Sequence, residues 1–210
     1  MRFPSYRAAG VLTVCLLSTS AFAYKAGING YSAKSTPTCT TCHNGGAAPT
    51  VEISGPTTLD AGATGQYTLI IRGGAGVKGG FDVAVDNTAA TLTAGTDSKL
   101  LSGELTHSAP KAFSGSEVRF DFSMVAPPTV ATSTGGTVVK IFGAGNSVNG
   151  DNAVSGDMSA TTSLSVTINA PAATPSTNED AGGCSSTGGA PVMLLSLLAG
   201  GMALLRRRRA

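Results

Sequence analysis

The feature that most constrains the fold is a series of short runs in which apolar and polar side chains alternate. In EVRFDFSMVAP (117–127), every second residue from Val118 to Met124 is apolar. A period of two is typical of a β-strand with one buried face, and no helical period persists over residues 24–170. Seven further runs lie at 51–54, 66–73, 80–87, 90–94, 99–108, 137–145 and 162–168.

Clusters of Gly, Pro, Asn and Asp separate these runs, as chain reversals require. The chain between the two ends is long enough for one domain. The sequence therefore predicts an all-β fold, an immunoglobulin-like antiparallel β-sandwich of seven or eight strands at 51–170. A separate segment at 24–50 precedes it.

Residues 1–23 have the pattern of a secretory signal peptide. Arg2 and Arg7 precede the apolar run AGVLTVCLLS, and the stretch closes on AFA, which predicts cleavage after Ala23. Cys15 lies in the apolar run and would be removed with it. The alternative is a membrane anchor that is not cleaved, for which this run is short.

Residues 171–210 are predicted to form a stalk and a short hydrophobic helix. The stretch 171–190, rich in Pro, Ser, Thr and Gly, contains Cys184 and is typical of a flexible linker. Residues 191–205 are apolar and run into four arginines. A helix of that length reaches about 22 Å, short for a bilayer, and the arginines would hold the C-terminus on the cytoplasmic side.

The order Gly-Gly-Cys-Ser-Ser, apolar span and arginine cluster resembles the bacterial C-terminal sorting tail called MYXO-CTERM. The resemblance implies processing near Cys184 by a membrane-embedded sorting protease, a lipid attached to Cys184, and display at the cell surface. The alternative is a plain single-pass anchor with the same topology. We therefore expect an exported protein held by its tail to the cell envelope, at the outer-membrane surface.

The charge of the chain excludes nucleic acid as a partner. The whole sequence has 14 Lys+Arg and 12 Asp+Glu, but six of the basic residues lie in the two ends. The remaining part has 8 basic against 12 acidic residues, so its net charge is about −4. Nucleic-acid binding needs a basic surface, which this composition does not supply.

The motif TCTTCHNGG (38–46) places Cys39 and Cys42 three apart, with His43 directly after the second cysteine. In covalent haem attachment, two thiols with this spacing add to the haem vinyl groups, and the histidine ligates the iron. The chemistry takes place outside the cytoplasm, where a signal peptide sends the chain. We expect one haem c held by Cys39 and Cys42, with His43 as the proximal iron ligand.

Three other interpretations of the motif stay open. A Cys39–Cys42 disulfide would close a tight loop in an oxidising compartment. A zinc site of two cysteines and two histidines would need His43 and His107 together. Thiol–disulfide exchange would need a helix after the second cysteine, which NGGAAP opposes.

A haem on this segment would have to lie against the sandwich, because residues 24–50 are too few to enclose it. The candidate distal ligand is His107 in ELTHSAP, and the alternative is a surface histidine that binds nothing. Met124 is expected in the core because it falls on the apolar face of its strand. Met158, in a loop rich in Gly and Asp, is a weaker candidate.

Oxygen-bearing side chains crowd one expected loop: Asn146, Asn149, Asp151, Asn152 and Asp157. They could bind calcium, but their spacing differs from that of an EF-hand loop, so we favour a turn over a calcium site. No enzyme motif is present, and the paired carboxylates Asp82 and Asp86 resemble those of a solvated strand. We do not expect an enzyme.

The stretches SGPTTLDAGATGQYTLIIRG, GGFDVAV, SGELTHSAP, VRFDFSMVAP and FGAGNSVNGDNAVSGD resemble the choice-of-anchor V domain, a bacterial relative of the Reeler domain. The resemblance covers about residues 38–168 and implies an immunoglobulin-like sandwich on exported proteins with varied anchors. Many of those relatives carry CxxCH before the first strand. The expected function is electron transfer or redox sensing with a partner protein. The alternative is a haem-free adhesion or structural module with a Cys39–Cys42 disulfide.

Overall fold

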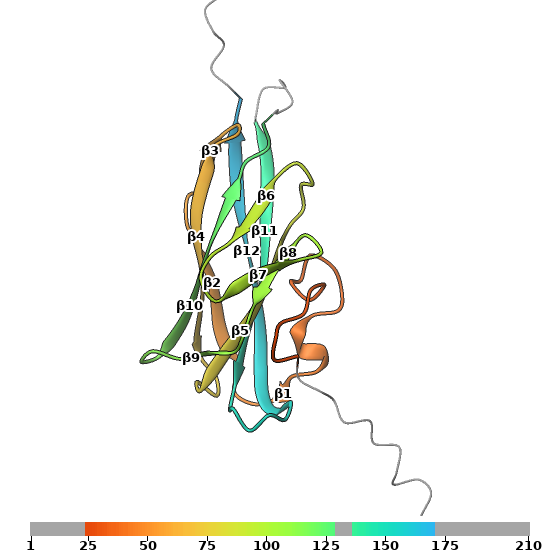
Figure 1. Ribbon diagram of the computed structural model, residues 1–210, viewed down its shortest axis with the longest axis vertical. Coiled ribbons are helices and arrows are strands. Elements are labelled where there is room, and N and C mark those ends of the chain that lie inside the picture. The colour runs from red at the N-terminus through yellow and green to blue at the C-terminus, as the bar shows by residue number, and fades with distance from the viewer. Residues whose placement is uncertain (1–23, 129–135, 171–210) are drawn as a thin grey trace, which may run out of the picture. The chain divides into compact units, whose positions relative to one another are not determined.

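The computed structural model describes residues 24–128 and 136–170. These residues form two β-sheets packed face to face, with no α-helix among them (Figure 1). The expected all-β sandwich is confirmed. The predicted signal peptide, stalk and tail helix lie outside the described residues, and no helix within those residues is long and apolar enough to cross a membrane.

One sheet has four antiparallel strands in the order β2–β4–β10–β6. Their bounds are Pro49–Ser54 (β2), Thr64–Gly73 (β4), Glu117–Val125 (β10) and Thr91–Ala94 (β6). In β10 the buried positions alternate with positions that are more exposed, as the sequence predicts.

The other sheet has the order β1–β12–β11–β5–β8–β7, with β3 beside β12 and β9 beside β5. Most pairs are antiparallel, whereas β1 and β3 run parallel to β12. The bounds are Asn44–Gly45 (β1), Thr58–Asp60 (β3), Lys78–Val85 (β5), Ser98–Leu101 (β7), Glu104–His107 (β8), Lys111–Ala112 (β9), Thr137–Val148 (β11) and Ser155–Asn169 (β12).

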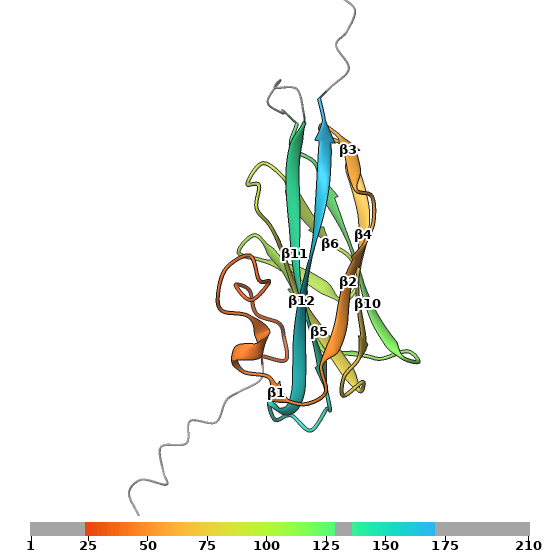
Figure 2. The same ribbon diagram turned by 180° about the vertical axis from the view of Figure 1, so that it is seen from behind.

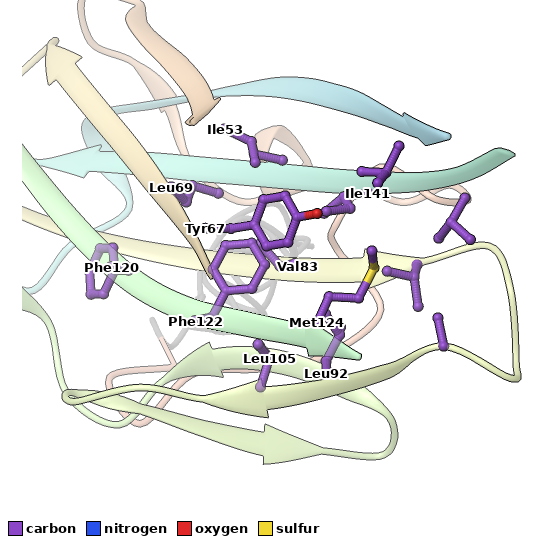
Figure 3. Close-up of a cluster of buried hydrophobic side chains, with 14 of the residues drawn as sticks. Ile53, Tyr67, Leu69, Val83, Leu92, Leu105, Phe120, Phe122, Met124 and Ile141 are labelled. Carbon is purple, nitrogen blue, oxygen red and sulfur yellow. The ribbon is translucent and has the colours of Figure 1, made fainter. Parts of the chain in front are cut away.

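The core fills the space between the two sheets (Figure 3). Phe120 of β10 meets Phe81 of β5 across it, with 4.5 Å between the ring centroids. Met124 is fully buried in the same core, so it packs there, as the sequence predicts, and does not reach the surface. Aromatic and branched side chains from both inner faces hold the sheets together through apolar burial.

The described residues contain more strands than the seven or eight expected. Short pieces such as β1, β3 and β9 add to the sheet edges. The run 99–108 is also not one strand but a hairpin, β7 and β8. Ser102 and Gly103 turn the chain with φ values of 51° and 87°, as a two-residue hairpin turn requires.

The segment before β2 covers the outer face of the larger sheet. Figures 1 and 2 show it, in red and orange, as an irregular chain beside that sheet, with one 3-10 turn, η2 (Cys39–Thr41). Its backbone is tied to the sheet at Gly30, which donates to Glu104 of β8, and at Tyr31, which donates to Asp82 of β5. The residues that carry the CxxCH motif therefore lie on the sandwich, as expected.

Candidate functional site

A cavity of about 210 Å³, partly open to solvent, lies between this segment and the outer face of the larger sheet. The segment contributes Cys39, Cys42 and His43 to the lining. The sheet contributes His107 at the end of β8 and Asp157 near the start of β12. The fold thus brings Cys39, Cys42, His43 and His107 to one cavity. These are the four residues that the sequence predicts for a haem site, although His107 is far from the motif along the chain.

The CxxCH motif is wound into a single tight turn. The His43 N–H donates to the Cys39 carbonyl at 3.1 Å, so the two cysteines and the histidine follow one another around η2. The chain then becomes extended at β1, which pairs with β12 at Ser155 and Asp157. No helix follows Cys42, as the sequence NGGAAP predicts.

The His43 ring is held by a buried carboxylate. Its Nδ1 lies 2.9 Å from Oδ2 of Asp157, whose side chain is only 1% exposed. The other oxygen of Asp157 accepts the Asn149 N–H at 2.9 Å, so the carboxylate is fixed from two sides. A carboxylate partner on Nδ1 leaves Nε2 as the ring nitrogen available to a metal ion, an arrangement typical of metal-binding histidines.

The two cysteine sulfurs are not bonded to each other. The Cys39 thiol lies 3.8 Å from the Tyr31 carbonyl, to which it donates. Burial raises the pKa of Cys39 to about 12, and the nearby Asp82 adds to this effect. The Cys39 thiol therefore keeps its proton at physiological pH, which opposes thiol–disulfide exchange because that reaction needs a thiolate.

His107 lies against the β5 backbone at Gly80. The Phe81 N–H donates to Nδ1 of His107 at 3.1 Å. A Cβ atom on Gly80 would come within 2.6 Å of the ring, so the absence of a side chain there makes room for it. Burial lowers the pKa of His107, and the ring is therefore neutral at physiological pH.

A buried carboxylate, Asp82, lies in the cavity wall, where the sequence predicts a solvated side chain. Asp82 is 1% exposed, whereas Asp86 at the end of the same strand is exposed and accepts the Lys140 N–H. The expectation of a solvated pair is therefore wrong for Asp82. Burial, followed by the neighbouring charge of Glu104, raises the pKa of Asp82 to about 8.

Asp82 and Glu104 also attach the covering segment to the sheet. The Tyr31 N–H donates to Oδ2 of Asp82 at 2.7 Å, and the preceding N–H of Gly30 donates to Glu104. The second oxygen of Asp82, Oδ1, is buried without a hydrogen-bond partner among the described residues. Because the raised pKa keeps Asp82 largely protonated at neutral pH and Oδ2 accepts the Tyr31 N–H, Oδ1 is the oxygen placed to carry the proton.

The remaining candidates are Met158 and the loop rich in oxygen-bearing side chains. Met158 follows Asp157 along β12, so its side chain points to the opposite face of the strand, away from the cavity. The side-chain oxygens of Asn149 and Asp151 accept backbone N–H groups of their own loop, at 3.1 and 2.8 Å. Such contacts are typical of side chains that stabilise a turn. In the described ranges, no three His, Cys, Asp or Glu side chains are placed to hold a metal ion, so the four-ligand zinc site is not assembled.

No family model matches the chain, and the search of curated proteins found no match to its sequence. The resemblances to the choice-of-anchor V domain and to the sorting tail therefore depend on the quoted motifs alone.

Substitution Asp82→Asn should change how stability depends on pH. The folded-state pKa of Asp82, about 8, lies above the ordinary value of 3.8. Between these values the carboxyl ionises in the unfolded chain and stays protonated in the folded protein, so the folded protein loses stability as pH rises. The Asn variant should therefore lose less stability across this window than the wild type. The measurement is the free energy of unfolding by urea titration, followed by circular dichroism at several pH values.

Asp86→Asn, on the same strand but exposed, is the control for losing a carboxylate. Parallel pH profiles for wild type and Asp82→Asn would show that Asp82 ionises in the folded state as it does in the unfolded chain.

Proposed function

We propose that this protein carries one covalently attached haem c in the cavity and uses it for electron transfer or redox sensing at the cell envelope. The observation that carries the proposal is the shared lining of the cavity: two unbonded thiols and a histidine whose Nδ1 is held by Asp157. The three groups have the order and spacing that covalent haem attachment requires.

The lining suits the group in its donor chemistry and its charge. Lys25 and Lys78 contribute to it and could pair with the two haem carboxylates. The cavity is smaller than the roughly 300–1,000 Å³ of enclosed ligand sites, so the ring would be partly exposed. An exposed edge suits exchange of electrons with an external partner.

Attachment uses the cysteines as thiols. Each S–H would add across one vinyl C=C bond, with the sulfur on one carbon and the hydrogen on the other, so that no outside oxidant or reductant would be needed. His43 would hold the iron through Nε2, with Asp157 beside its Nδ1. The haem supplies a one-electron couple, and the protein sets its potential through the histidine and its buried carboxylate partner.

The proposed location follows from the two chain ends. The pattern of residues 1–23 supports export, and the tail beginning at Cys184 supports attachment to the envelope, with the membrane and a sorting protease as partners. A soluble or membrane-bound redox protein would be the electron partner. This placement agrees with the proposed cofactor, because covalent haem attachment takes place outside the cytoplasm.

The first test is the absorbance of protein exported from cells that mature c-type cytochromes. The wild type should give the α band of a covalent haem c after reduction in alkaline pyridine, and Cys39→Ser/Cys42→Ser should lose it. His43→Ala should keep a covalent haem with an altered iron spectrum. A colourless wild type without free thiols would overturn the proposal and favour the haem-free adhesion module.

A second test concerns Asp157→Asn, which keeps the size of the side chain and an acceptor oxygen but removes the charge. A carboxylate on Nδ1–H makes the imidazole a stronger donor and stabilises oxidised iron, so the reduction potential should rise in the variant. Spectroelectrochemical titration measures it. Asp151→Asn in the neighbouring loop is the matched control, and equal potentials for Asp157→Asn and wild type would contradict the role of Asp157.

The anchor is tested with Cys184→Ser. If the cysteine is the site of processing and lipid attachment, the variant should lose incorporation of a labelled fatty acid and should no longer be displayed at the cell surface. Cell fractionation and surface labelling measure both effects, with haem content as the internal control. Unchanged surface display without any lipid on the wild type would favour a plain single-pass anchor.

A further inference from the structure

We propose that residues 24–38 form a lid over the cavity that opens more often as pH rises, with the carboxyl groups of Asp82 and Glu104 as its latch. The lid is the part of the covering segment that precedes the CxxCH motif (Figure 2). Four of its residues line the cavity: Tyr24, Lys25, Ile28 and Tyr31. An open lid uncovers the cavity, so pH would control how readily a large group enters it. Because lid and latch belong to this chain alone, they would act with or without a haem.

The lid is held to the sandwich by little apolar burial. Of residues 24–38, only Ser32 is buried, and none belongs to the core between the two sheets. A segment with so few buried apolar contacts opens locally at a smaller cost in free energy than unfolding of the whole domain. The hydrogen bonds between the lid and the sheet therefore have a large share in keeping it closed.

Two of these hydrogen bonds attach consecutive residues of the lid to neighbouring strands. The Tyr31 N–H donates to Oδ2 of Asp82 on β5 at 2.7 Å, and the Gly30 N–H donates to Glu104 on β8. Asp82 is paired with Thr106, and Glu104 lies two residues before Thr106, so both carboxyl groups are on the outer face of the sheet. Since both acceptors are carboxyl groups, the attachment can respond to pH.

The lid can move as a unit about its attachment to β12. Inside the lid, Ser32 forms a backbone bridge with Thr38. Beyond the motif, the Gly46 N–H donates to the Asp157 carbonyl at 3.0 Å, and a Cβ atom on Gly46 would collide with the β12 backbone. This close contact between backbones keeps the segment on β12 while residues 24–38 leave β5 and β8.

The latch makes closing of the lid depend on a proton. Asp82 is 1% exposed, and two carboxylate charges close together in such a place are unfavourable. Burial, followed by the charge of Glu104, raises the pKa of Asp82 to about 8, whereas water under an open lid would return it toward the ordinary 3.8. Closing therefore takes up a proton between these values, and opening releases it. The open fraction should rise with pH by at most about tenfold per pH unit.

The other titratable groups around Asp82 are Lys99 of β7, His107 of β8, and Cys39 and Tyr31 of the covering segment. Lys99 lies in the same cross-strand row, and its positive charge would favour ionised Asp82, which opposes the direction of the pKa shift. On the other side, β11 places the uncharged Ala144 beside Asp82. A variant that changes Asp82 alone separates its contribution from those of the other groups.

The test is hydrogen exchange of the full exported protein, read by mass spectrometry at several pH values. Protection factors, which correct for the direct effect of pH on exchange, should fall with rising pH in peptides that cover the lid and stay constant in peptides of β4 and β10. Asp82→Asn keeps an acceptor for the Tyr31 N–H but has no proton to lose. It should remove most of the pH dependence and leave the lid better protected than in wild type near pH 8. Asp86→Asn is the matched control and should behave as wild type.

A second variant, Glu104→Gln, keeps an acceptor for the Gly30 N–H and removes the neighbouring charge, so the rise in exchange should be smaller. It tests the latch even if Asp82→Asn does not fold. Constant protection of the lid in wild type, an equal fall in Asp82→Asn, or an equal fall in the core strands would each overturn the proposal. The haem-free variant Cys39→Ser/Cys42→Ser should show the wild-type pH dependence. A colourless wild type would therefore remove the proposed function and leave the lid in place.

Discussion

Each sheet of a sandwich turns one face to the core, and in the larger sheet the outer face of β5 is buried as well. Here the segment before β2 covers it, attached by backbone N–H groups to Asp82 and Glu104. The segment and the larger sheet do not pack fully against each other, and a cavity remains between them. Every residue of the candidate site lines this gap, so the site exists because the cover and the sheet do not fully fit.

The fold could be predicted because alternation is a local signal that the register later confirms. The site was predictable only in its local part: the spacing of Cys39, Cys42 and His43. Pairing His43 with Asp157 depends on the parallel contact of β1 with β12, which no local pattern encodes. Met158 could not be placed from the sequence for a similar reason. Neighbouring residues of a strand point to opposite faces, so a shift of one residue decides whether a side chain faces the cavity. The Ser102–Gly103 turn, in contrast, carried a readable signal in its sequence.

Asp82 was misjudged because a lone aspartate between apolar residues is usually exposed, and only the covering segment buries it. A carboxylate in such a place costs stability, and a costly buried group beside a cavity is a common mark of a working site. The same reasoning separates Asp82 from Asp86, which share a strand face and differ only in what lies above them. Burial by a distant segment is a property of the tertiary structure alone.

The length of β12 has a consequence for how the molecule would meet a partner. The strand runs from the cavity, at Asp157, to Asn169 near the end of the described residues (Figure 1). At about 3.3 Å per residue, these two points are roughly 40 Å apart. Whatever binds at the cavity would therefore meet the end of the sandwich where β12 begins, and not the end at Asn169.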